Sequence, residues 1–415
     1  MKRKVIRSLI FVLDGIGLNI TTEKLDSKIW RYVCCMLLFI YTNFTLIMYS
    51  FTHRENFFEA ASPIIFIGGS NIMMVGVSAI FYHRQKLRQM LFNMDCGMFT
   101  YPDEDRIPVN YSWILNEKNN ANVYYLVLLV ILFAYSVLLT MAVLQWCLYK
   151  QIKIFIYPNW TPWKGGGATH QISSLILQHV TVICGLWFFY IVCIFLIATA
   201  IEFAKQVERL CAAVQSLDQR TKVMTLKECN RTEVLFQIQD DTLRKNVQNL
   251  QESKFNNKFN AFFKENIINC TRHHQIIITN YKLFHAVFRT IFSVELTYCS
   301  VTLSLGLFYM IYAPNLQLVM NSFVVILVVI MNFFTRCFIG EQFAKLNIKL
   351  RNTVFYESRW YEQSKENWQL LFLFHNQVSY PINLKGFSVI QASLTTFTSI
   401  IRTAYSFFSV LKRSV

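Results

Sequence analysis

The sequence predicts an all-α polytopic membrane protein with seven transmembrane helices. Hydrophobic residues make up 54% of the 415 residues and charged residues only 15%, whereas a soluble domain carries about 25% charged residues. The apolar residues gather in runs of about 20 or more, the length that an α-helix needs to cross about 30 Å of hydrocarbon. These runs are too long, and alternate too little with period two, for the strands of a membrane β-barrel.

The predicted elements begin with a basic N-terminal arm, MKRKVIRSLIFVLDG. Its start resembles a signal peptide, but the apolar stretch from Leu9 to Leu13 is too short and Asp14 ends it. We therefore expect a cytosolic arm that lies near anionic lipid headgroups. Seven apolar runs follow the arm, and each one predicts a membrane span. The spans are residues 30–51, 63–82, 123–149, 173–201, 287–313, 318–342 and 387–411.

The connections between spans alternate in charge. With the long stretch 202–279 set aside, one set of connections carries 17 Lys and Arg residues and the opposite set carries six. Positive residues collect on the cytosolic side of membrane proteins, and the rule holds for short connections. The count therefore predicts a cytosolic N-terminus, and seven crossings place the C-terminus outside the cell. This orientation is the reverse of that of a G-protein-coupled receptor.

The stretch 202–279 is predicted to be helical and cytosolic. Apolar residues recur at helical spacing in IEFAKQVERLCAAVQSL and in NKFNAFFKENIINCTRHHQIIITNYKLFHAVF, with charges on the other face. We expect the membrane helices to continue several turns into the cytosol and to pack together there. His273 and His274 are adjacent, so their side chains leave different faces of the helix and favour a structural role over a metal site.

The outer connection 150–172 contains YPNWTPWKGGG, whose prolines and glycines predict an irregular loop. This loop either covers an extracellular opening or is a plain connector. Asn159 lies in a glycosylation sequon on the predicted outer face. Two further sequons, at 110–112 and 230–232, fall on predicted inner loops.

Composition and motifs exclude several classes of function. The net charge of +16 is spread between the apolar runs, unlike the single basic face of a nucleic-acid-binding protein. The eleven cysteines include no CxxC pair and no zinc spacing. We find no catalytic residues, no metal ligands and no cofactor motif, so an enzyme is not expected. Glu295 is the one acid well inside a predicted span, where a buried structural partner suits it better than catalysis.

The seventh predicted span carries an ordered polar stripe. A charge at mid-membrane depth costs at least about 2.5–3.5 kcal/mol if it faces lipid, so the stripe should face protein or water. Two interpretations remain open: hydrogen bonds between helices, or the wall of a water-filled pore. Steps of three and four residues join Ser388, Gln391, Thr395, Thr398, Arg402, Tyr405, Ser409 and Lys412 on one helix face.

A second candidate site lies in the outer halves of the second, third, fourth and sixth spans. Apolar and aromatic residues with a few polar groups are typical of small-molecule pockets, although each residue alone also suits helix packing or lipid contact. The candidate pocket residues are Phe66, Ile72, Met73, Met74, Leu139, Val143, Trp146, His179, Ile183, Trp187, Phe188 and Phe323.

The last 80 residues carry motifs of a known family. Tyr356 and Trp360 stand four residues apart in CFIGEQFAKLNIKLRNTVFYESRWYEQ, and WQLLFLFHNQ follows. The final stretch, SLTTFTSIIRTAYSFFSVLKR, contains a Ser-Leu-x-Thr-Phe group and a Tyr-Ser-x-Phe-x-x-Leu pattern. In these features the chain resembles the insect odorant receptors, the seven-helix, inside-out family of odour-gated cation channels. It departs from the family in SYPINLKGF, which has Pro381 and a single glycine, Gly386, before the last span.

The resemblance implies an odour-tuning subunit that assembles with co-receptor subunits into a heterotetramer in the plasma membrane. The seventh helices would form a central pore for cations, opened by a small volatile hydrophobic ligand. The cytosolic ends of the fourth to seventh helices would form an anchor that holds the subunits together. By position, Tyr405, Phe408 and Lys412 fall near the extracellular gate. The alternatives are a gustatory-type channel, a G-protein-coupled receptor and a transporter.

These expectations divide the chain into three regions. Residues 1–201 hold the arm, spans one to four and the ligand-pocket region. Residues 202–386 hold the anchor helices with spans five and six, and residues 387–415 form the pore-lining helix.

Overall fold

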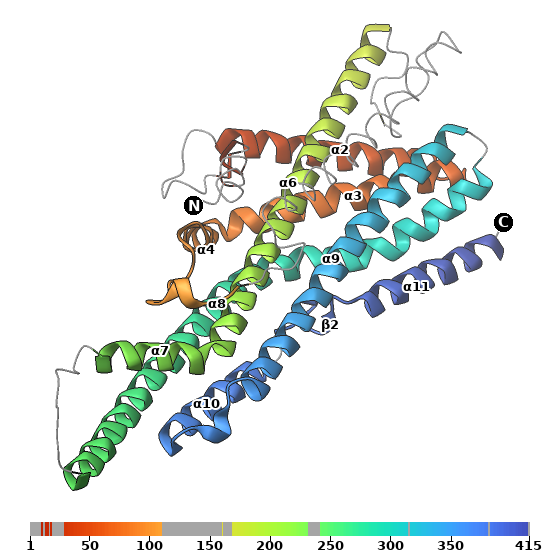
Figure 1. Ribbon diagram of the computed structural model, residues 1–415. Coiled ribbons are helices and arrows are strands. Elements are labelled where there is room, and N and C mark those ends of the chain that lie inside the picture. Colours follow the sequence, from red (N-terminus) through yellow and green to blue (C-terminus); the bar gives the residue numbers. More distant parts are fainter. Residues whose placement is uncertain are drawn as a thin grey trace.

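The described part of the protein is all-α apart from one short hairpin (Figure 1). The computed structural model describes residues 29–109, 168–230, 241–313, 316–380 and 382–413, together with residues 10, 13–15, 17–18 and 160. The predicted third span and most of the predicted loop 150–172, with Asn159, lie outside these residues, as does most of the N-terminal arm. Residues 168–172, predicted as the end of that loop, are helical.

The helices vary widely in length because some of them continue far beyond a membrane. The longest, α8, has 72 residues, which at about 1.5 Å per residue is about 108 Å, more than three times the hydrocarbon thickness. The α-helices are α2 (Ile29–Thr52), α3 (Phe57–Tyr82), α4 (Arg84–Cys96), α6 (Ala168–Gln215), α7 (Leu217–Asn230), α8 (Asp241–Tyr312), α9 (Leu316–Tyr356), α10 (Lys365–Val378) and α11 (Leu394–Arg413). The short elements are the 3₁₀ turns η1 (Glu104–Arg106) and η3 (Trp360–Glu362) and the strands β1 (Lys385–Gly386) and β2 (Ile390–Gln391).

Local signals account for several helix boundaries. The α3 helix begins after Asn56, whose Oδ1 accepts the Phe58 backbone N–H at 3.1 Å. The α4 helix ends at Gly97, which has φ +100°, a left-handed conformation that glycine adopts without steric cost.

Five described helices are long and apolar enough to cross a membrane: α2, α3, α6, α8 and α9. They contain five of the seven predicted spans. The seventh prediction was wrong at its start, because residues 387–393 form a turn and strand β2 and α11 begins only at Leu394. With its hydroxyls and three basic residues, α11 is not among these five helices.

The core lies around α8, which packs against α3, α6, α9 and α11. A ladder of buried rings runs along it, with Phe284, Phe288 and Phe292 at centroid distances of 6.0 and 5.4 Å, and Phe333 of α9 stacks on Phe292 at 5.8 Å. In Figure 1 the first half of α8 extends with α7 and α10 to one end of the molecule, opposite the end that holds the C-terminus. We call this the anchor end. Helices therefore continue beyond the predicted spans, as the periodicity of 202–279 predicted.

Candidate functional site

The terminal helix α11 starts from a tight hairpin that is seated on α8. Strand β1 pairs antiparallel with β2, and the turn between them holds Phe387 and Ser388 at φ +47° and +64°. Gly386 lies against the core of α8, where a Cβ atom would stand 2.8 Å from side-chain carbons of Phe292 and Leu296. A larger residue at this position would lift the hairpin from α8.

The first turn of α11 is seated on α9 as well. A Cβ atom on Gly340 would overlap the carbonyl oxygen of Ala392, so only glycine allows this close approach. Ser393 caps the new helix, since its Oγ accepts the Thr396 backbone N–H at 3.2 Å. Phe397 then packs against the rings of Phe333 and Phe334 of α9. The start of α11 is therefore held by two helices and a cap.

Most of the remaining surface of α11 faces away from the bundle. Ala404 and Phe408 are its buried residues, and Tyr405 is 64% exposed. The hydroxyls of Thr398 and Ser409 donate to carbonyls of their own helix, at Thr395 and Tyr405. We name the outward row the terminal polar stripe. It comprises Thr395, Thr398, Arg402, Tyr405, Ser409 and Lys412, of which Ser409 is half-buried and the others are exposed.

This placement shortens the predicted stripe at its start and clarifies its direction. Ser388 lies in the hairpin turn and Gln391 in β2, so neither continues the stripe on a helix. Phe408 points inward, with 9% of its surface exposed. Among the described residues the stripe does not join helices of one protomer, because the described helices lie behind it. Its polar groups face either water or another chain.

The predicted pocket residues do not all converge. Ile72 and Phe188 are buried in the helix bundle, whereas Ile183, Trp187 and Phe323 are roughly half exposed on its outside. Phe66, Met73, Met74 and His179 are half-buried. Leu139, Val143 and Trp146 lie outside the described residues. The α3 members of the predicted set are thus buried or half-buried, whereas Ile183 and Trp187 of α6 and Phe323 of α9 face outward.

A polar chain crosses the bundle beside this set. Asn43 of α2 donates to Asn71 of α3 at 3.1 Å, and Asn71 donates to the Tyr298 hydroxyl of α8 at 3.2 Å. The amide of Asn43 also lies 3.5 Å from the Met74 sulfur. The sequence signal for this chain is weak, because its members come from three helices and share no spacing.

Glu295 forms a buried ion pair between two membrane helices. It contacts Arg336 of α9, and both side chains are almost fully buried. Asn332, one turn before Arg336, donates to the same carboxylate at 2.5 Å and accepts from Cys193 of α6 at 3.3 Å. The predicted structural partner of Glu295 is therefore found. The network ties α6, α8 and α9 at mid-bundle, where an unpaired charge would be costly.

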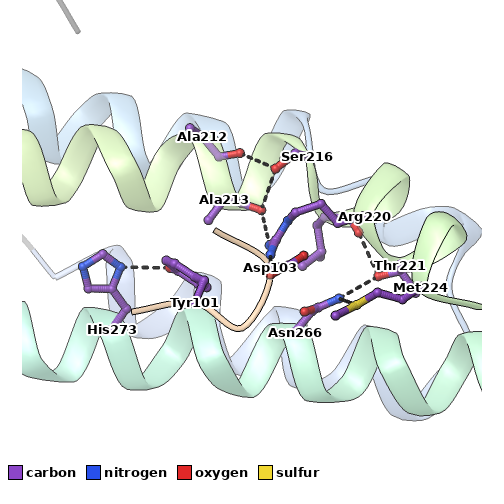
Figure 2. Close-up of polar contacts among 11 residues, drawn as sticks. Tyr101, Asp103, Ala212, Ala213, Ser216, Arg220, Thr221, Met224, Asn266 and His273 are labelled. Carbon is purple, nitrogen blue, oxygen red and sulfur yellow. Dashed lines mark hydrogen bonds and ion pairs between the residues drawn. The ribbon is translucent and has the colours of Figure 1, made fainter. Parts of the chain in front are cut away.

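A second network lies at the anchor end (Figure 2). Arg220 of α7 donates to Asp103 at 2.8 Å and to the Ala213 carbonyl at 2.8 Å. Arg220 is 1% exposed, so the loop that follows α4 is fixed between α6, α7 and α8. We name this the polar cluster, comprising Tyr101, Asp103, Gln206, Arg220, Thr221, Asn266 and His273.

His273 has the predicted structural role within the polar cluster. Its Nε2 lies 3.1 Å from the side-chain Oε1 of Gln206 and its Nδ1 lies 2.8 Å from the Tyr101 hydroxyl. Nε2 therefore carries the proton and Nδ1 accepts, which is the neutral imidazole. Burial, with Arg209 nearby, lowers the pKa of His273 to about 3, and burial lowers that of His274 to about 4.

The part of the chain that the structure describes contains no group of three or more His, Cys, Asp or Glu residues arranged to hold a metal ion. The described residues can bind a ligand, transmit movement between helices and line a polar surface. It offers no described constellation for covalent chemistry.

Comparison with known proteins agrees with this geometry. The sequence model of the 7tm Odorant receptor family matches residues 56–405. No curated protein matches the chain by sequence. Among solved structures, insect olfactory receptor OR5 from Machilis hrabei in complex with eugenol has a TM-score of 0.76 at 13% identity, over 100% of this chain and 98% of that chain. A second structure of that receptor gives 0.75 at 13% identity, over 99% and 97%.

Proposed function

The chain belongs to the 7tm odorant receptor family, and from that premise we propose that it is the odour-tuning subunit of a ligand-gated, non-selective cation channel. It is a multi-pass membrane protein and not an enzyme. Its partners in the proposal are co-receptor subunits in a heterotetramer, a small volatile hydrophobic ligand, membrane lipids and permeating cations. Its location is the plasma membrane, with the N-terminus inside and the C-terminus outside.

The terminal polar stripe is the observation that carries the channel proposal. A helix that exposes Arg402 and Lys412 together with a row of hydroxyls needs an aqueous or protein environment on that face. One such helix from each of four subunits, with its stripe turned to a common axis, encloses a water-filled path. This arrangement leaves Ala404 and Phe408 packed on their own subunit, as observed.

A surface for subunit contact is available at the anchor end. Phe372 and Leu373 of α10 are each 57% exposed, and Trp368 stacks on Phe372 at 5.7 Å. Large apolar side chains grouped on a helix outside the predicted spans favour contact with another protein. We therefore assign α10 to the heterotetramer interface.

The ligand site is proposed among the half-buried residues of α3 and the neighbouring helices. The solved receptor with this fold binds eugenol, a ligand consistent with an apolar pocket that has a few polar groups. In this chain Phe66, Met73 and Met74 would supply apolar contact. The polar chain from Asn43 to Tyr298 would supply hydrogen bonds and link α2, α3 and α8.

Gating requires that the ligand bind the open state more tightly than the closed state. We name the close contacts of Gly386 with α8 and of Gly340 with Ala392 the seat of α11. The seat offers a route for this coupling, since through it α8 and α9 hold the start of α11. Movement of α8 or α9 on ligand binding would shift the seat and turn α11. The exposed Tyr405 would then change the width and wetting of the outer pore, while the inward Phe408 keeps α11 packed on its own subunit.

The direct test is expression of the full chain with and without an insect odorant co-receptor, with current recorded against a panel of volatile ligands. We expect ligand-dependent cation current only with the co-receptor. Absence of current despite surface delivery would contradict the proposal, and ligand accumulation without current would favour a transporter. Epitope tags at both ends test the orientation, and an exposed N-terminal tag with a hidden C-terminal tag would favour a G-protein-coupled receptor.

A further inference from the structure

Basic side chains gather where the hairpin before α11 rests on α8. Arg289 of α8 donates to the Ser388 hydroxyl in the hairpin turn at 3.4 Å. One turn earlier, His285 Nε2 accepts the backbone N–H of Lys385 at 3.3 Å. Lys282 stands three residues before His285 and therefore on the same face of α8. This face of α8, with the hairpin, presents three cations close together.

The start of α4 adds a fourth cation. Helix α4 packs against α8, and burial lowers the pKa of His83, which Lys86 and Arg289 lower further. Burial also lowers the pKa of His285, with further lowering by Arg289 and Lys385. Every charge that acts on these two imidazoles is positive, and Arg289 acts on both. We name these cations the basic cluster, comprising Lys86, Lys282, Arg289 and Lys385.

The basic cluster is not neutralised by the described part of the chain. Its members are exposed, apart from the half-buried Lys385, and none of them forms an ion pair with a described carboxylate. Lys345 and Lys349 of α9, by contrast, each contact a glutamate. Four neighbouring cations without counter-charges favour an anion that carries several negative charges.

The basic cluster lies at the predicted cytosolic surface of the membrane. The predicted second span ends at residue 82 and the predicted fifth begins at residue 287, so two separate spans give the same level. Lys282 precedes residue 287 by about 7.5 Å along α8, which is the depth of the headgroup layer. Tyr82 and Phe387 beside the cluster are 82% and 56% exposed, and aromatic rings are typical of this interface. The level favours a lipid headgroup over a dissolved anion.

We propose that the basic cluster binds the headgroup of phosphatidylinositol bisphosphate in the inner leaflet. Groups of about four to eight Lys and Arg residues directly beyond a membrane helix are typical of sites for such headgroups. The headgroup would contact α4, α8 and the hairpin, with Arg289 at the centre. The proposal uses the orientation given under the proposed function, and it goes beyond that function because the lipid is neither the odorant nor the permeating ion.

The test measures the affinity of the purified full-length chain for lipids with short acyl chains. Dioctanoyl phosphatidylinositol bisphosphate is titrated against the labelled chain in detergent, and dioctanoyl phosphatidylcholine is titrated in parallel. We expect saturable binding of the bisphosphate lipid alone. K86Q combined with K282Q should weaken it about thirtyfold, because each cation near anionic headgroups contributes about 1 kcal/mol. R289Q should weaken it as a separate variant.

A matched control removes the same charge elsewhere. R351Q combined with K365Q takes two exposed cations from the anchor end, and it should leave the affinity unchanged. Soluble inositol trisphosphate separates the lipid from its headgroup, and we expect it to bind more weakly because it lacks acyl chains. The melting temperature of each lipid-free variant should match that of the wild type, since the substituted residues are exposed.

Four outcomes would overturn the proposal. The wild type could bind both lipids equally, or the two double variants could lose the same affinity, which would show an effect of net charge alone. Inositol trisphosphate could bind as tightly as the lipid, which would make the cluster a site for a soluble anion. K86Q with K282Q could lose oligomers and keep its lipid affinity, which would make the cluster a subunit interface. The readout needs neither odorant nor current, so a chain that binds the lipid but conducts nothing contradicts only the proposed function.

Discussion

The polar cluster at the anchor end and the terminal polar stripe place similar residue types in opposite environments. In the polar cluster Arg220 is 1% exposed and bonded to Asp103 and to a backbone carbonyl. On the stripe Arg402 and Lys412 are exposed, and neither has an ion-pair partner among the described residues. A buried charge needs a partner within the fold, whereas an exposed row of charges and hydroxyls is available to water, ions or another subunit. The first region is therefore structural and the second is the candidate for function.

The largest expected loss of stability follows from breaking the polar cluster. Arg220→Ala leaves Asp103 buried and unpaired, and we expect the free energy of unfolding to fall by about 3–5 kcal/mol. Thermal unfolding in detergent, followed by tryptophan fluorescence, measures the change. Lys222→Ala removes the exposed partner of the half-buried Asp218, which Arg359 also approaches at 3.7 Å, and this matched control should cost less than about 1 kcal/mol. Equal effects of the two variants would show that the polar cluster is not more important than a surface pair.

A smaller loss of stability is expected at Gly340, where α9 contacts Ala392 just before α11. Gly340→Ala pushes a methyl group against Ala392 and should lower the free energy of unfolding by about 1–3 kcal/mol. It should also alter ligand-dependent opening, because the seat of α11 moves. Gly69→Ala, where a Cβ meets nothing within 4 Å, should be neutral or slightly stabilising. Unchanged ligand-dependent opening in Gly340→Ala would contradict the proposed role of the seat in gating.

Acidification should weaken the polar cluster and leave the stripe unaffected. Burial lowers the pKa of His273 to about 3 from an ordinary value of 6.5, so the unfolded chain binds a proton that the folded chain cannot. Stability from this group is complete above pH 6.5 and is lost as the pH falls from 6.5 toward 3. One pH unit below 6.5 should lower the free energy of unfolding by about 1.4 kcal/mol.

The pH effect is measured as the shift in melting temperature between pH 7.5 and 5.5. His273→Gln should reduce the shift, because it removes the buried imidazole. An identical pH dependence in His273→Gln and the wild type would mean that His273 is not the group that responds.

The smallest effect on stability, with a large effect on permeation, is expected on the stripe. Arg402→Gln removes an exposed charge and should change the free energy of unfolding by less than about 0.5 kcal/mol. If the stripe lines the pore, the same change should alter the relative permeability to Na⁺, K⁺ and Cl⁻ in reversal-potential measurements. A matched substitution of the exposed Lys86, on α4, to Gln should change neither quantity.

The sequence predicted the membrane helices well because their signal is local. Runs of apolar residues placed α2 and α3 within a few residues and identified α6, α8 and α9. The start of α11 was misplaced because Val389 and Ile390 continue the apolar pattern, although the chain turns there with Phe387 and Ser388 at positive φ. The contact of Gly340 with Ala392, which requires this turn, joins residues far apart in the sequence.

The candidate sites were predictable to different degrees. The stripe from Thr395 to Lys412 follows from a fixed spacing on one helix, and the structure places it on one outward face. The polar cluster was not predicted, since Asp103 and Arg220 are 117 positions apart and nothing local links them. The outer pocket residues were chosen for their chemistry alone, and chemistry does not show which face of a helix turns inward, so Ile183 and Trp187 lie on the outside.

Cysteine accessibility along α11 tests the central claim, that the terminal polar stripe lines a water-filled pore. Single cysteines are placed at Thr398, Arg402 and Tyr405 on the stripe, and at Ala404 and Phe408 on the buried face. Each variant is expressed with a co-receptor and treated with a charged thiol reagent during ligand-evoked current. We predict modification of the current at the three stripe positions and none at the buried pair. Current that is insensitive at all three stripe positions, with the cysteines present at the cell surface, would contradict the account.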